Sequence, residues 1–117
     1  MRVLIAYEDA YRSYGQALAG AVRGLRPGAE VSLVHARRLA PEVARLDPHL
    51  VICNRPNDVD PGGRAAWVTL SEEPEGPSEA CVGGRRRALR NPGIEELLAV
   101  VDDAEDLLRS GRDPGGC

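Results

Sequence analysis

The sequence predicts an α/β fold built on a parallel sheet. Short apolar runs without polar alternation, typical of buried strands, alternate with segments whose apolar residues recur every three or four positions. The order in the first half is strand, helix, strand, helix, strand, which favours parallel strands joined by crossover helices. A chain of 117 residues with 43% hydrophobic residues is long enough for one domain with one core.

The first strand is predicted at residues 2–7, RVLIAY, a short and mostly apolar run that contains β-branched residues. A helix follows over 9–28, with Asp9 as its N-cap and Pro27-Gly28 as its stop. One apolar stripe marks its buried face: Tyr14, Leu18, Ala21, Val22 and Leu25. These positions predict which side of the helix packs on the sheet.

Next come a strand at 30–36, a short helix within 37–47 and a third strand at 49–54. Pro41 suits the first turn of that helix, where a missing N–H costs little. The second half predicts, in order, a loop at 55–63, a strand at 65–71, a loop at 72–79, a short fifth strand at 80–84, a lead-in at 85–93, a helix at 94–110 and a frayed tail at 111–117.

Composition narrows the function classes. The net charge of -3 gives no overall attraction to nucleic acid or to an acidic membrane. All fifteen basic residues are Arg, which removes every lysine-dependent mechanism. No segment reaches the roughly 18 apolar residues of a membrane span, and Met1 leads directly into a strand, so we expect neither membrane anchor nor signal peptide.

The three cysteines lack a metal-binding spacing. Cys53 and Cys81 lie in apolar runs, where cysteine behaves as a small buried hydrophobe, and Cys117 ends a Gly-rich tail as a free thiol. This usage predicts a reducing, cytoplasmic location.

Four segments resemble a CheY-like response-regulator receiver domain, spread over residues 1–108: RVLIAYEDAYRSYGQAL, PHLVICNRP, WVTLSE and NPGIEELLAVVDDA. The resemblance implies a flavodoxin-like three-layer sandwich with a five-stranded parallel sheet over residues 1–110, followed by a disordered tail at 111–117. The connections after Asn54 and Ser71 are shorter than in a receiver, so helices three and four are expected to be reduced or missing.

The resemblance also implies a degenerate phosphoacceptor pocket. Glu8 and Asp9 match the acidic pair that holds Mg²⁺, and Arg55 would add a backbone carbonyl. Asn54 stands where the phosphorylated Asp belongs, and Ser71 matches the hydroxyl that senses the phosphoryl group. The Lys that ends the fifth strand of a receiver is missing, with Gly83, Gly84 or Arg85 in its place. Asn cannot form an acyl phosphate, and it also relieves repulsion among carboxylates.

These features favour a pseudo-receiver, a signalling module that binds a protein partner such as a sensor kinase without phosphorylation and without a cofactor. Mg²⁺ at Glu8 and Asp9 stays open beside a second interpretation, in which the two acids only stabilise a helix start. Missing helices would leave one sheet face without cover, which predicts a homodimer. Its surface would include Arg55, Trp67 and the 72–90 segment, with acidic residues 72–79 facing basic residues 85–90 across a two-fold axis.

Trp67 and the arginines Arg85, Arg86 and Arg87 are the predicted partner-binding residues, although Trp67 in its strand is also a natural core residue. Nucleic acid is a weaker interpretation of RRRALR, because glutamates precede it and no aromatic residue interleaves it. His35 and His49 lack metal-like spacing and are expected to be structural.

Two other function classes stay open. CVGGRRR matches the Cys-x5-Arg loop of low-molecular-weight phosphatases and arsenate reductases, in which Cys81 would attack phosphorus and Arg87 would hold the oxygens. Ala88 stands where that loop has Ser or Thr, and the segment precedes the last helix instead of following the first strand, so we do not expect an enzyme. The last class is a flavodoxin-like domain that binds a small ligand.

Overall fold

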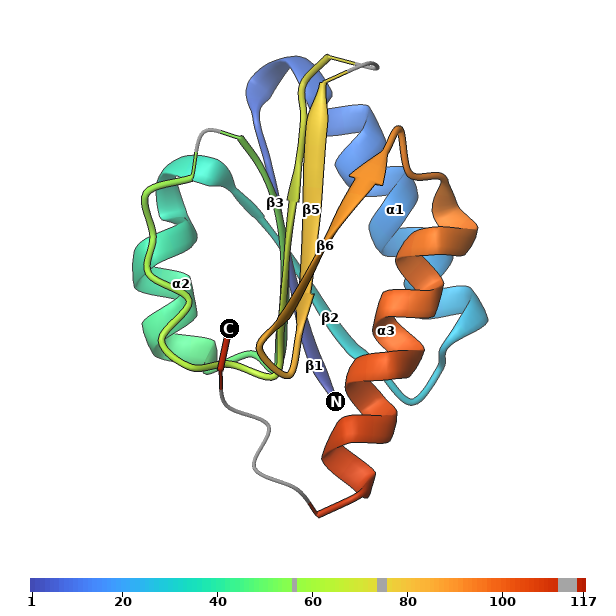
Figure 1. The fold of residues 1–117 in the computed structure, drawn as a ribbon. Helices are drawn as coiled ribbons and strands as arrows, with labels where there is room; N and C mark the ends of the chain where they lie inside the picture. Colours follow the sequence, from blue (N-terminus) through green and yellow to red (C-terminus); the bar gives the residue numbers. More distant parts are fainter. Residues whose placement is uncertain (56, 74–75, 112–115) are drawn as a thin grey trace.

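The computed structural model describes residues 1–55, 57–73, 76–111 and 116–117 as one sheet flanked by helices (Figure 1). In chain order its elements are β1 (Arg2–Tyr7), the 3-10 turn η1 (Asp9–Tyr11), α1 (Arg12–Leu25), β2 (Glu30–His35), the 3-10 turn η2 (Ala36–Arg38), α2 (Leu39–Leu46), β3 (Leu50–Asn54), β4 (Ala66–Leu70), β5 (Pro77–Val82), β6 (Arg85–Arg90) and α3 (Ile94–Arg109). None of the helices in these residues is long and apolar enough to cross a bilayer.

The α/β class is confirmed, but the sheet is mixed. Within the described residues it has six strands in the order β2-β1-β3-β4-β5-β6. The strands β1 to β4 pair in parallel, whereas β5 and β6 are antiparallel to their neighbours. The predicted sheet of five parallel strands is therefore wrong in the direction of the fifth strand and in the number of strands.

The cause is a hairpin between β5 and β6. Gly83 and Gly84 have φ of 58° and 85°, and a two-residue turn with positive φ at both positions matches the twist of paired strands. The segment 72–79, predicted as loop, already contains the start of β5, and 85–93 contains β6 instead of only a lead-in to the last helix. The Gly-Gly pair was interpreted as the end of a strand, although it is also a hairpin signal.

Helices α1 and α3 cover one face of the sheet, and α2 lies on the other (Figure 1). The first face holds the larger core, with Ile5, Val22, Ile52, Val68 and Leu97 all almost fully buried. The guanidinium of Arg26 at the end of α1 donates to both carboxylate oxygens of Asp102 on α3, at 2.6 and 2.9 Å. The predicted stripe of α1 is displaced, since Tyr14 and Leu25 are 44% and 55% exposed. The buried positions of α1 are Gly15, Leu18, Ala19 and Val22.

The second face is covered as well, and the expectation of an open sheet face is wrong. Trp67 is 5% exposed and shares a core cluster with Leu4, Val43 and Val51. Only α2 supplies a helix there in the described residues. The irregular segment 57–65, before β4, runs past α2 in Figure 1, and Val59 from this segment packs against the Trp67 cluster. Trp67 is thus a core residue and is not available for the predicted homodimer surface, whose other members Arg55 and β6 are largely exposed. The homodimer stays a prediction.

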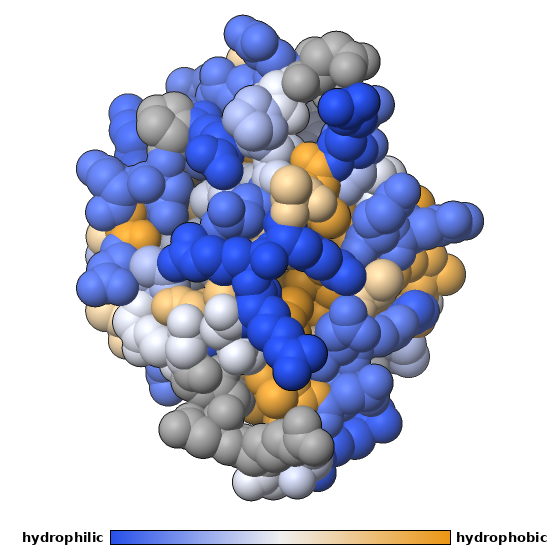
Figure 2. Space-filling model, viewed as in Figure 1, coloured by the Kyte–Doolittle hydropathy of each residue, from blue (hydrophilic) through white to orange (hydrophobic). Residues whose placement is uncertain are grey.

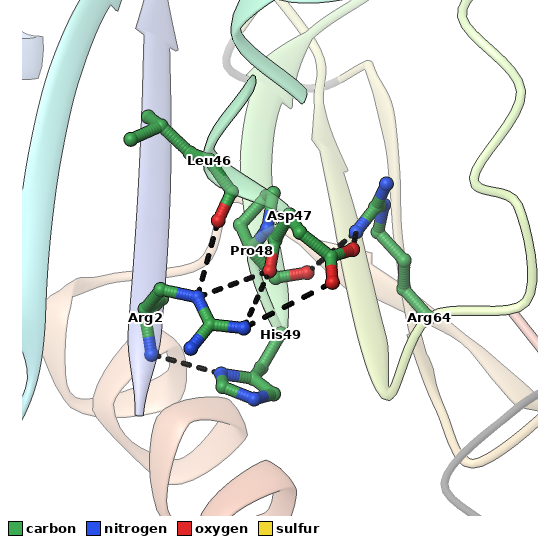
Figure 3. A network of polar contacts seen from close by, with 6 residues as sticks. All are labelled: Arg2, Leu46, Asp47, Pro48, His49 and Arg64. Atoms are coloured by element: carbon green, nitrogen blue, oxygen red, sulfur yellow. Dashed lines mark hydrogen bonds and ion pairs between the residues drawn. The ribbon is translucent and has the colours of Figure 1, made fainter. Parts of the chain in front are cut away.

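A network of hydrogen bonds and ion pairs lies at the end of the sheet where the parallel strands begin (Figure 3). The Arg2 guanidinium donates to the carbonyls of Leu46 and Asp47 at 2.9 to 3.1 Å, at the C-terminal end of α2. Arg64 donates to the Asp47 carboxylate at 2.8 Å. The backbone N–H of Arg2 donates to Nδ1 of His49 at 2.9 Å, so this nitrogen accepts and must be unprotonated. His49 is therefore structural, as the sequence predicts.

The hydrogen bond that His49 accepts from the N–H of Arg2 makes the free energy of unfolding depend on pH. Burial lowers the pKa of His49, and Arg2, the N-terminus and Arg64 lower it further against the opposing charge of Asp47. The unfolded chain then binds a proton more readily than the folded one, so the His49 contribution is complete above about pH 6.5 and is lost as pH falls towards the folded pKa.

We expect chemical denaturation to show a loss of unfolding free energy between about pH 7 and pH 5, and His49→Gln, which keeps an acceptor without a titrating ring, to flatten that slope. An unchanged slope in His49→Gln would show that other groups cause the pH dependence.

Candidate functional site

A cavity of about 240 Å³ lies at the carboxyl ends of β3 and β4 and the amino end of the antiparallel strand β5, beside the start of α1. This is the edge at which the crevice of a parallel sheet is expected. Its lining residues are Tyr11, Tyr14, Asn54, Leu70, Ser71, Glu72, Glu73, Ser78, Asn91 and Pro92. Of the five residues in the predicted phosphoacceptor pocket, only Asn54 and Ser71 line it.

Strand alternation places Asn54 in this cavity. Ile52 belongs to the core under α1 and α3, whereas Cys53 belongs to the core under α2, so Asn54 projects to the α1 and α3 side. Leu70 in β4 pairs in register with Asn54 and faces the same core. The cavity therefore begins where the apolar core under α1 and α3 ends.

Ser71 is held in a turn. Its backbone N–H donates to Oγ of Ser78 at 2.8 Å, and its own Oγ accepts from the N–H of Glu73 at 3.1 Å. A Cβ on Gly76 would lie 1.9 Å from the Ser71 Oγ, so this close approach needs glycine. The predicted role of Ser71 as a phosphoryl sensor stays a prediction, and in this structure its hydroxyl organises the turn after β4.

Two tyrosines complete the cavity. The hydroxyl of Tyr11 donates to the Glu72 carbonyl at 2.9 Å and ties the start of α1 to the turn after β4. The Tyr14 hydroxyl has no hydrogen-bond partner among the residues that the structure describes, and burial raises the pKa of Tyr14. Tyr14 therefore stays a neutral hydrogen-bond donor at physiological pH.

The acidic pair does not join Asn54. Asp9 Oδ1 lies 2.7 Å from His35 Nε2, while His35 Nδ1 accepts from the N–H of Arg37 at 3.0 Å. Because Nδ1 accepts, the ring proton is on Nε2 and points at Asp9. Glu8 starts η1 and its carbonyl accepts from Tyr11 N–H at 2.9 Å. Asp9 is not the N-cap of α1, which begins at Arg12 after Tyr11.

Within the described ranges, no group of three or more His, Cys, Asp or Glu side chains is arranged to hold a metal ion. Glu8 and Asp9 as Mg²⁺ ligands stay a prediction, and one carboxylate oxygen of Asp9 is engaged by His35. Arg55 is exposed and lies outside the cavity, and its backbone N–H donates to the Leu70 carbonyl at 2.8 Å, which extends the β3–β4 pairing.

The structure does not form the Cys-x5-Arg phosphate loop. Residues 81–87 belong to the β5–β6 hairpin, in which Cys81 pairs with Arg86 and Arg87 pairs with Ala80. Arg87 lies near Asp103 of α3 at 3.8 Å, on one side of the sheet, whereas Cys81 forms a disulfide with Cys117, which packs on the other side. A thiolate at Cys81 and the Arg87 guanidinium therefore cannot hold one phosphoryl group.

The disulfide also overturns the prediction of a free thiol at Cys117. The Cα atoms of Cys81 and Cys117 are 5.9 Å apart, within the range of disulfides. Residues 112–115 of the predicted disordered tail lie outside the described residues. Because disulfides persist mainly in oxidising compartments, cysteine usage no longer supports a cytoplasmic location, which stays a prediction. Cys53 is free and buried, and burial raises its pKa to about 12.

Sequence reasoning missed Tyr11, Tyr14, Ser78 and Asn91 as cavity residues. Tyr14 was assigned to the apolar stripe, and Ser78 to a loop. Asn91 has φ of 42°, the left-handed conformation that Asn tolerates better than most residues, so Asn-Pro after a run of arginines was a usable turn signal.

Searches of protein-family models, of curated proteins and of solved structures give no match to this chain. The residues of the cavity and of the sheet edge therefore carry the functional argument.

The disulfide gives a direct test. Without reductant, we expect Cys117→Ser to lower the free energy of unfolding in urea by roughly 3–4 kcal/mol, because the bond joins residues 36 apart in sequence and restricts the unfolded chain. The reductant should destabilise the wild type by a similar amount and leave Cys117→Ser unchanged. Three reactive thiols in the unreduced, unfolded wild type would contradict the bond.

Proposed function

We propose that this chain is a receiver-like interaction module that binds an acidic, extended protein segment without being phosphorylated. One observation supports a receiver-like module that is not phosphorylated. The amide of Asn54 ends β3 at the cavity, and the acidic side chain of Asp9 is turned away to His35. An amide is a poor nucleophile for phosphorus, and the chain has no Lys to neutralise a phosphoryl group.

The arginine-rich strand β6 supplies the docking surface. It is the last strand of the sheet, and five of its six residues are exposed. Figure 2 shows strongly hydrophilic side chains crossing the front of the molecule, where Figure 1 places β6. An edge strand presents unpaired N–H and C=O groups that can accept a further strand.

The hairpin decides which groups face outward. In a two-residue hairpin the residues that flank the turn exchange hydrogen bonds, and narrow and wide pairs then alternate. Val82 and Arg85 flank the turn. The backbone groups of Arg86, Ala88 and Arg90 therefore point to the free edge, where they could bind an added strand.

Charge identifies the partner. Arg86 pairs with Glu79 at 3.0 Å and Arg87 approaches Asp103, while Arg85 and Arg90 have no acidic partner among the described residues. A second copy pairing through β6 would bring arginine against arginine, which disfavours the predicted homodimer at this edge. Glu79 also meets Arg86 within the chain, so this pair is not available across a two-fold axis. An acidic segment avoids both problems.

We expect no phosphoryl transfer from acetyl phosphate. Incubation with acetyl phosphate and Mg²⁺, followed by intact mass measurement, should show no added phosphoryl group. Asn54→Asp should stay unmodified as well, since the Lys is absent and Asp9 is held by His35. A hydroxylamine-labile phosphoryl adduct on the wild type would exclude the proposed mechanism.

Docking can be tested with a labelled peptide of alternating Glu and Val, and with a Gln-Val peptide as its neutral control. We expect saturable binding of the acidic peptide, weakened about fivefold by Arg90→Glu, since an exposed ion pair contributes up to ~1 kcal/mol. Ala88→Pro should abolish binding, because it removes an outward N–H that β5 does not use.

The matched variant Arg23→Glu reverses one exposed charge on α1, away from β6. If it weakens binding as much as Arg90→Glu, the peptide responds to net charge and not to this edge. Binding of the neutral peptide with equal affinity would also refute the charge argument.

A further inference from the structure

We propose that the cavity at the ends of β3, β4 and β5 binds a small, neutral, planar heteroaromatic molecule of the nucleobase type. This site is separate from the β6 edge and does not depend on docking there. Its volume of about 240 Å³ is below the roughly 300–1,000 Å³ of pockets for drug-sized ligands, so it suits a base or a nucleoside.

Three polar side chains of the cavity have no hydrogen-bond partner in the described part of the chain. Neither the carboxamide of Asn54 nor that of Asn91 has a hydrogen-bond partner among the residues that the structure describes, and the same holds for the Tyr14 hydroxyl. A carboxamide offers a donor beside an acceptor. It therefore matches a ring edge on which an acceptor nitrogen lies beside an exocyclic amine, as on adenine.

The remaining walls suit a flat ring. Leu70 and Pro92 supply apolar surface, and Tyr11 and Tyr14 supply aromatic surface on which a base can stack. The Tyr11 hydroxyl is already engaged with the Glu72 carbonyl, so this ring is fixed before a ligand arrives. A fixed wall reduces the ordering that binding would otherwise require.

The charged residues around the cavity favour a neutral ligand over an anionic one. The charged residues that line the cavity are Glu72 and Glu73, and both are exposed. No arginine is among the lining residues that the structure describes. Phosphate groups would be repelled, which favours a free base or nucleoside over a nucleotide or a nucleic-acid strand.

Titration of ¹⁵N-labelled protein with adenosine tests the site. We expect saturable shifts of the backbone amides of Asn54, Ser71 and Ser78, with a dissociation constant below about 1 mM. Asn54→Leu, similar in size but apolar, should weaken binding at least about tenfold. Gln16→Leu, on the exposed side of α1 and outside the cavity, should bind like the wild type.

If Asn54→Leu does not fold, Tyr14→Ala replaces it, since this partly exposed side chain can be removed at lower risk to the core. AMP should bind more weakly than adenosine at low salt, and a short oligo-dA strand more weakly still. No saturable shift in the wild type with adenosine, adenine, cytidine or uridine would overturn the proposal. Equal or tighter binding of AMP would overturn it too, as would full affinity in both cavity variants.

Discussion

The central strands of this small sheet are buried on both faces, and the described residues contain only three helices to bury them. Two of these helices lie on one face, where Arg26 and Asp102 tie them together. On the other face, α2 and an irregular segment together cover the strands. The backbone N–H and C=O groups of such a segment need hydrogen-bond partners. Asn57 exchanges hydrogen bonds with Val59 at 3.0 and 3.2 Å, and the Asp60 carboxylate accepts from Gly62 N–H at 2.9 Å. These short local bonds let a loop replace a helix over Trp67.

The same shortage of helices shapes the candidate site. Where the core under α1 and α3 ends, the polar residue Asn54 ends β3, Ser71 follows β4, and the space beyond Leu70 is not filled. Gly15 lets α1 approach β1 closely, since a Cβ there would lie 3.0 Å from the Cβ of Tyr7. The start of α1 is thereby held near the strand ends, with its tyrosines at the cavity. A cavity with fixed walls and free carboxamides follows from how the helices are placed.

Periodicity in the sequence was sufficient for the first half of the fold. The strands near residues 2–7, 30–36 and 49–54 and the helix near 94–110 were predicted within one or two residues, because buried strands and amphipathic helices have distinct apolar patterns. The strand β6 has no such pattern: Arg85, Arg86 and Arg87 are all exposed, and its pairing comes from the Gly83-Gly84 turn. Contacts between distant segments leave no local signal, so neither the bond from Cys81 to Cys117 nor the turn of Asp9 towards His35 could be predicted. Of the predicted site, Asn54 and Ser71 meet at one cavity because Asn54 ends β3 and Ser71 directly follows the adjacent parallel strand β4.

If β6 docks an acidic segment as proposed, its arginines would make this exposed edge selective. An unprotected edge strand invites pairing with any extended chain, including a second copy of itself. Ion pairs with Glu79 and Asp103 engage the middle arginines, whereas Arg85 and Arg90 at the two ends keep their charge uncompensated within the described chain. A strand that adds here meets positive charge at both ends. Self-pairing is then opposed by repulsion, and a neutral chain gains only backbone hydrogen bonds. Under the proposed function an acidic chain would gain those bonds and two charge contacts, so the charge pattern that opposes self-pairing would also discriminate among partners.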